Sequence, residues 1–253
     1  MAHIASIKRY ELKGISKFVD DLINDCRVGG HDAKLPGIAL VDPPCLGARC
    51  ECEVEIRLQH EFQGGEGRLV IVGGGGVTVA SVPLTDVTGR TVRVLLPPQE
   101  AGPLTVGVEG SLSEAAYATL LVLPSDACRD VEEIFVLMAD AIREEASPLR
   151  SGTADARESL ILESAWRDYF QPFATDLGGL LQVLAAKGQL SPRDSNLLHS
   201  QLVYMLQNCA WALAAYFLRA CLSYGIPIKI GSCQFSEEDV DPAVLRRLAQ
   251  EFE

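Results

Sequence analysis

Five residues near the start of the chain have side chains that suit a zinc ion: Cys26, His31, Cys45, Cys50 and Cys52. Thiolate and imidazole are the ligands that Zn²⁺ prefers in a tetrahedral site. The spacing is unfavourable, because the sequence contains no Cys-x2-Cys pair. A zinc site, in an enzyme or in a zinc-stabilised protein, is therefore an alternative interpretation of these residues.

The residues around Cys50 and Cys52 favour a structural role for both thiols. The two cysteines alternate along the sequence with Val54, Ile56 and Leu58, and charged residues occupy most of the positions between. A period of two is typical of a strand with one buried face. We therefore predict that both cysteines lie in the core, where free cysteine is common.

Other catalytic or ligand-binding motifs are absent from the sequence or lie in an unsuitable context. The run Gly73–Gly76 could bind phosphate, but a β-branched segment follows it and predicts a hairpin turn. There are four histidines and no Gly-x-Ser-x-Gly motif. Glu51, Glu53 and Glu55 share one face of the first strand and indicate a charged outer surface. We predict no catalytic residue and no cofactor, so an enzyme is not favoured.

Six strand patterns fill the segment 50–124, which we predict to be a small antiparallel β-sandwich or barrel-like domain. The connections are too short for crossover helices, so neighbouring strands are expected to be antiparallel. The predicted strands lie near 50–62, 68–73, 77–83, 90–97, 103–109 and 116–123.

Helical patterns flank this segment, so the predicted fold class is α+β. Residues 1–49 should form an N-terminal helix, over 6–26, and a linker rich in glycine and proline. An amphipathic helix over 125–146 should connect the β-domain to the helices that follow. A C-terminal helical bundle should follow over 154–253, with an interruption near Pro172.

The helix predicted over 192–224 is apolar on nearly every side. We predict that Tyr204, Trp211 and Phe217 contact a partner. A membrane-active protein that releases this helix is a further alternative. No stable membrane span is expected, because polar residues such as Asn208 and Arg219 interrupt the run.

The charge balance limits the class of partner. The 253 residues carry a formal net charge of −12, and no basic stripe is present that would indicate nucleic-acid binding. The N-terminus lacks a signal-peptide pattern, and eight cysteines in so long a chain favour free thiols in the cytoplasm. The leading hypothesis is a non-enzymatic adaptor or regulatory subunit. It would dock through the apolar helix or an exposed sheet edge onto a protein with a basic surface, or onto a second copy of itself.

Overall fold

The computed structural model describes residues 36–62, 67–109, 117–145, 153–186, 190–226, 228–230, 233–235 and 240–250. The predicted helix over 6–26, together with Cys26 and His31, lies outside these residues. Residues 35–253 form one unit, and all that follows concerns this unit. Its architecture is mixed α+β, as predicted.

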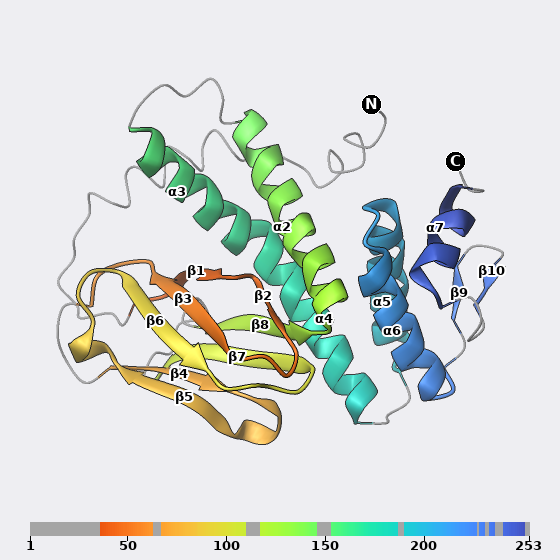
Figure 1. The fold of residues 1–253 in the computed structure, drawn as a ribbon, viewed down its shortest axis with the longest axis horizontal. Coiled ribbons are helices and arrows are strands. Elements are labelled where there is room, and N and C mark those ends of the chain that lie inside the picture. Colours follow the sequence, from red (N-terminus) through yellow and green to blue (C-terminus); the bar gives the residue numbers. More distant parts are fainter. Residues whose placement is uncertain are drawn as a thin grey trace. The chain divides into compact units, whose positions relative to one another are not determined.

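Eight of the described strands form two sheets (Figure 1). The first sheet has the order β1-β3-β6 and the second has the order β2-β8-β7-β4-β5. The six strands predicted from sequence are all present, with ends that differ by a few residues. The bounds are β1 Ile38–Asp42, β2 Cys45–Gly47, β3 Cys52–Leu58, β4 Arg68–Val72, β5 Thr78–Pro83, β6 Thr91–Leu96, β7 Gly102–Glu109 and β8 Tyr117–Leu123.

Strands β1 and β2 lie within the segment that the sequence predicted to be a linker, so that prediction is wrong. Strand β1 pairs antiparallel with β3. Strand β2 pairs with β8, and this pair is parallel, which also corrects the expectation that all neighbours are antiparallel. Residues 38–41 are buried on both faces of β1. A strand buried in this way shows no alternation, and β2 has only three residues.

The two sheets contribute to the same interior. The inward-facing residues of both sheets, among them Val54, Ile56, Leu69 and Val106, belong to one buried core.

The described helices follow the strands in sequence. Their bounds are α2 Ser125–Glu145, α3 Ala154–Ser164, the π-helical segment η6 Ala165–Phe170, α4 Gln171–Ala185, α5 Pro192–Gln207, α6 Trp211–Ser223 and α7 Pro242–Gln250. A two-stranded hairpin of β9 (Lys229–Ile230) and β10 (Cys233–Gln234) precedes α7. Pro172 lies in the first turn of α4, directly after η6, where a proline can be accommodated. The chain therefore stays helical from α3 to α4, and the predicted interruption corresponds to the π-helical segment η6.

The single helix predicted over 192–224 is wrong, because the structure contains two helices there. Helix α5 begins with a capping box between Ser191 and Asp194, as its sequence indicates. It ends at Gln207, and Cys209 then adopts a left-handed backbone conformation with φ of 61°. Such a residue ends a helix, and α6 begins after it and packs against α5.

Helices cover one side of the two sheets. Helix α4 packs against the outer face of β7 and β8, helix α2 contacts β2, and α3 and η6 contact β1 (Figure 1). An aromatic cluster of Phe135, Trp166, Phe170, Phe173 and Tyr204 joins α2, η6, α4 and α5, with successive ring centroids 4.9–6.1 Å apart. The helices and strands therefore share a continuous interior.

Candidate functional site

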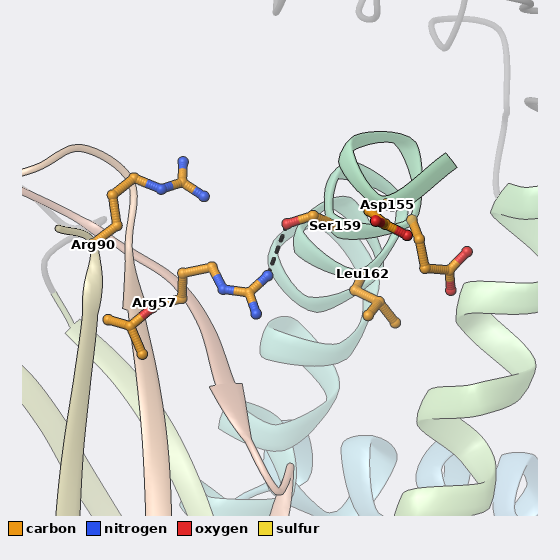
Figure 2. A pocket seen from close by; sticks show the side chains of 7 residues that line it. Arg57, Arg90, Asp155, Ser159 and Leu162 are labelled. Carbon is orange, nitrogen blue, oxygen red and sulfur yellow. Dashed lines mark hydrogen bonds between the residues drawn. The ribbon is translucent and has the colours of Figure 1, made fainter. Parts of the chain in front are cut away.

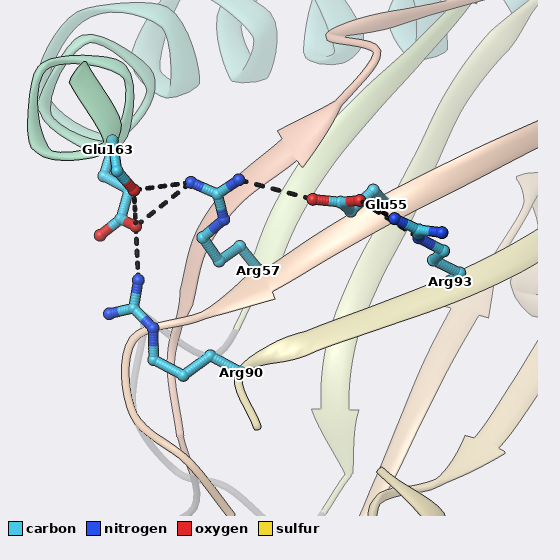
Figure 3. Close-up of polar contacts among 6 residues, drawn as sticks. Glu55, Arg57, Arg90, Arg93 and Glu163 are labelled. Atoms are coloured by element: carbon cyan, nitrogen blue, oxygen red, sulfur yellow. Dashed lines mark hydrogen bonds and ion pairs between the residues drawn. The ribbon is translucent and has the colours of Figure 1, made fainter. Parts of the chain in front are cut away.

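A chain of alternating charges connects the first sheet with helix α3. Because Val54, Ile56 and Leu58 point inward, Glu55 and Arg57 of β3 point outward. Arg93 stands opposite Glu55 on β6, and its Nη2 lies 3.2 Å from Glu55 Oε2. We call Glu55, Arg57, Arg90, Arg93 and Glu163 the arginine–glutamate cluster (Figure 3).

The carboxylate of Glu163 forms ion pairs with two arginines. Arg90 Nη2 donates to Glu163 Oε1 at 2.6 Å, and Arg57 Nη1 lies 3.6 Å from the same oxygen. Arg57 also donates to Ser159 Oγ at 2.8 Å and to Glu55 Oε1 at 3.4 Å. Ser159 in turn donates to Glu163 Oε1 at 3.2 Å. Glu163 therefore links α3 to β3 through Arg57 and to the residue directly before β6, Arg90.

Two open hollows border the cluster. The first, of about 470 Å³, has Arg57 and Arg90 on the strand side and Asp155, Ser159 and other residues of α3 opposite (Figure 2). The second, of about 370 Å³, is lined by Asp42, Pro43, Glu53, Glu55 and Arg93. Glutamate already pairs with each guanidinium of the cluster. This arrangement suits the attachment of α3 to the sheet better than catalysis, because the cluster contains neither an imidazole nor a carboxylate without a cationic partner.

The outer row of glutamates predicted from sequence is partly engaged within the chain. Glu55 is held by Arg57 and Arg93, so its charge is met by the chain's own arginines. Sequence reasoning missed the cluster. The spacing of Ser159 and Glu163, four residues apart on one helical face, was the local signal that could have indicated a polar site on α3.

Three of the predicted zinc-ligand cysteines fall in the described part of the chain. Cys45 is buried on β2, where its thiol lies 3.9 Å from the carbonyl oxygen of Leu46, and Cys128 is buried on α2. Cys52 is half-buried at the start of β3, and Cys50 precedes the strand and is exposed. The prediction that Cys50 lies in the core is therefore wrong, because β3 and its alternation of buried and exposed side chains begin only at Cys52.

Among the described residues, no three side chains of His, Cys, Asp or Glu are close enough together to hold a metal ion. Cys26 and His31 lie outside those residues, so the five-residue zinc hypothesis stays a prediction. Burial raises the pKa of the Cys45 thiol well above its ordinary value. Burial also raises the pKa of Cys52.

The structure divides the predicted partner-binding residues between two helices. Tyr204 lies on α5, half-buried, with its ring 5.6 Å from that of Phe173. Trp211, at the start of α6, is half-buried as well. Phe217 is fully buried and packs against Tyr216. Much of the apolar surface of α6 is therefore used inside this unit.

The described helices leave one edge of each sheet without a neighbouring strand. Strands β5 and β6 end their sheets, and among the described residues no further strand pairs with either of them. Figure 1 shows β5 on the side away from the described helices, whereas the start of β6 faces α3. Val77 and Leu95 are 65% and 62% exposed there. We call β5, β6 and Val77 the open edge.

Strand β5 has few of the features that protect edge strands. Natural edges are commonly blocked by charged side chains, by proline or by a bulge. The segment Thr78–Pro83 contains no charged residue, and its proline is the last residue. A register shift is present near Val72 and Thr78. Among the described residues, no strand pairs with the side of β5 away from β4, and Arg68 of β4 donates to Ser81 Oγ of β5 at 3.0 Å.

Comparisons with known proteins give this chain no family. No protein-family model matches it, and no curated protein matches it significantly. Among the described helices, none is both long enough and apolar enough to cross a membrane.

Proposed function

We propose that this protein is a non-catalytic interaction module that binds a partner protein by strand addition at β5. The observation that carries the proposal is the edge strand itself, which is uncharged and hydrogen-bonded on one side only among the described residues. In this mode an extended peptide adds a strand to the sheet. Main-chain hydrogen bonds provide affinity, and alternate side chains provide specificity.

The open edge is a better candidate docking surface than the apolar helix. Phe217 is fully buried in the helical core, so presenting it to a partner would require α6 to leave its neighbours. Val77 and Leu95 are exposed without any rearrangement. An apolar side chain of the partner could cover them, and burying apolar area contributes about 25 cal/mol per Å².

The partner is expected to be a protein with a basic surface. The chain has a formal net charge of −12, and opposite charge increases the rate at which two proteins associate. The role would be that of an adaptor or regulatory subunit. Self-association through β5 would give a homo-oligomer instead, which is a distinct outcome of the test.

Affinity capture with substitutions at the open edge tests the proposal. Val77→Lys with Thr78→Lys places two charges beside the unpaired backbone, which blocks strand addition. Proteins retained by the wild type should be lost from this variant. The matched control is Val136→Lys with Leu137→Lys, two exposed positions on α2, which should retain them.

Native mass spectrometry of the same proteins separates the outcomes. A complex with a second protein that disappears in the edge variant supports the proposal. A dimer of the chain that disappears in the edge variant assigns the edge to self-association and overturns the partner proposal. Complexes that survive in the edge variant but not in the α2 variant would place the binding surface on α2.

A further inference from the structure

We propose that the partner segment added to β5 has two apolar side chains at alternate positions, which cover Ala80 and Val82, and a polar residue between them that pairs with Ser81. This inference rests on the proposed strand addition and names the kind of segment that β5 accepts. It follows from the directions in which the backbone groups and the side chains of this strand point.

The register of β4 and β5 determines which backbone groups of β5 face the open side. Leu84 donates its N–H to the carbonyl oxygen of Gly67 at 2.9 Å, and the pairing with β4 continues without a shift as far as Ala80. Hydrogen-bonded and non-hydrogen-bonded pairs alternate along an antiparallel ladder. Leu84 and every second residue before it therefore bond to β4, whereas Ser81 and Pro83 direct their backbone groups away from it.

The position of Pro83 agrees with this register. A proline has no N–H to donate, so it is tolerated in an edge strand where its nitrogen faces away from the neighbouring strand. Among the described residues no strand pairs with this side of β5. An added strand can therefore bond to the N–H and C=O of Ser81 and to the C=O of Pro83.

The inner side chains of β5 are left partly uncovered. Ala80 and Val82 stand opposite Ile71 and Leu69 of β4 and share their face of the sheet. Leu69 and Ile71 are each 1% exposed. Ala80 and Val82 are only half-buried, although they pack against the same core. Apolar side chains on a further strand would cover these two residues, and this burial would stabilise the complex.

The alternation of side chains then defines the added segment. Successive residues of a strand point to opposite faces of the sheet. The two neighbours of the residue that pairs with Ser81 therefore lie on the inner face, beside Ala80 and Val82. The middle residue lies on the outer face, where Ser81 is exposed and its Oγ accepts a hydrogen bond from Arg68 at 3.0 Å. A polar residue between two apolar ones therefore fits β5.

The charge of the chain decides between two occupants of this edge. Strand β5 itself has the pattern, since Ala80 and Val82 flank Ser81, so a second copy could pair with it. The formal net charge of −12 on each copy opposes that contact, whereas a segment with lysine or arginine at its ends is attracted. The occupant is therefore a segment of a different protein that combines alternate apolar residues with basic ends.

Selection of peptides on the full-length protein tests this pattern without a known partner. A displayed library of random heptapeptides is selected on the wild type, and the retained clones are tested on two variants. Clones lost from the edge variant, Val77→Lys with Thr78→Lys, but retained by the α2 variant, Val136→Lys with Leu137→Lys, bind the open edge. These clones should be enriched in apolar residues at two alternate positions around a polar residue, relative to the unselected library.

A substitution on the inner face of β5 tests the apolar contact itself. Val82→Thr keeps the shape of the side chain and replaces a methyl group by a hydroxyl, so it should weaken binding of an enriched peptide about threefold to tenfold. The matched control is Ser81→Thr on the outer face of the same strand, which should change the dissociation constant by less than about twofold. Fluorescence polarisation of the labelled peptide measures both.

The outcomes separate this inference from the proposed function. Edge-dependent peptides without the alternate apolar pattern, or equal effects of Val82→Thr and Ser81→Thr, would overturn the inference and leave strand addition in place. A selection without any edge-dependent peptide would also overturn it, and affinity capture of whole proteins then decides the proposed function. A dimer of the chain that the edge variant dissociates would assign the edge to a second copy and overturn both. The wild-type selection decides the pattern even where Val82→Thr fails to fold.

Discussion

Glu163 is the residue that holds the arginine–glutamate cluster together, because its carboxylate meets both Arg57 and Arg90. Its side chain is only 13% exposed, so its ion pairs are shielded from water more than surface pairs are. Glu163→Gln should lower the free energy of unfolding by about 1–2 kcal/mol, since two guanidinium groups would lose a partner. Urea denaturation monitored by tryptophan fluorescence measures this change.

The matched control is Glu100→Gln at the ion pair with Arg49, whose side chains are 79% and 78% exposed. Exposed pairs contribute little, so this change should alter the unfolding free energy by less than about 0.5 kcal/mol. Equal effects of the two substitutions would show that the cluster does not attach α3 to the sheet.

Asp130 is a second residue whose charge has a measurable consequence. Its Oδ2 accepts a hydrogen bond from the backbone N–H of Leu213 at 2.9 Å, which caps the first turn of α6 from a different helix. Burial raises the pKa of Asp130 above its ordinary value, although the backbone hydrogen bonds at Leu213 and Ala212 oppose this. The folded state therefore holds the proton of Asp130 more tightly than the unfolded state does.

This raised pKa determines the sign of a pH effect. The contribution of Asp130 to stability is complete below its ordinary pKa, and it is lost as the pH rises through the raised value. Asn at this position keeps an acceptor oxygen and does not titrate. Asp130→Asn should therefore gain stability relative to the wild type as the pH rises from about 3 to 7. Urea denaturation of both proteins across this range would contradict the prediction if the difference stayed constant or fell.

The sequence could predict parts of these sites but not their assembly. The alternation of β3 correctly places Glu55 and Arg57 on its outer face, and the helical spacing puts Ser159 and Glu163 on one side of α3. Their contact joins residues about one hundred positions apart. Such pairings depend on how the elements pack, and no local pattern records them.

At the scale of elements, Gly178 determines how closely α4 approaches the second sheet. A Cβ atom at this position would lie 3.0 Å from Thr119 Cγ2 and 3.1 Å from Pro103 Cβ. The neighbouring Gly179 is exposed and has open space around its Cβ position. The two glycines share one helix, so each controls for the helix propensity of the other.

Alanine at the two positions should have opposite effects. Gly179→Ala should stabilise the protein by about 0.5–1 kcal/mol, because alanine favours the helix. Gly178→Ala gains the same propensity but presses against β7 and β8, and it should be about 1–3 kcal/mol less stable than Gly179→Ala. Urea denaturation of both variants tests this. Equal stabilisation by the two alanines would mean that α4 does not pack closely on the sheet.

The strands and helix ends that were predicted differ from those that were missed in how clearly the local sequence pattern marks them. The six predicted strands have clear alternation or flanking turns. Strand β1 lacks alternation because the second sheet, through β8, lies against one of its faces and α3 and η6 cover the other. The break at Asn208–Ala210 contains neither glycine nor proline. It is produced by the left-handed conformation of Cys209 and the packing of α5 on α6, and a propensity argument does not reveal either.

At the scale of the whole molecule, the sheets and helices of residues 35–253 should unfold together. Helix α2 follows β8 after a single residue, α4 covers β7 and β8, and the buried side chains of strands and helices belong to one core. Removing the helices would expose the outer face of the second sheet, which includes the fully buried Leu121. Elements that share so much buried surface are expected to have a single transition.

Two probes on opposite parts of the molecule test this cooperativity. Both tryptophans, Trp166 and Trp211, are in the helical half, so their fluorescence follows the helices. Amide exchange of Val54 and Val94 follows the first sheet, which lies on the other side of the core. The two unfolding free energies should agree within about 0.5 kcal/mol, and Gly178→Ala should lower both equally. If the sheet amides exchanged through an opening of lower free energy, the strands would form an independent unit. The cluster around Glu163 would then be a contact between two separately folding parts.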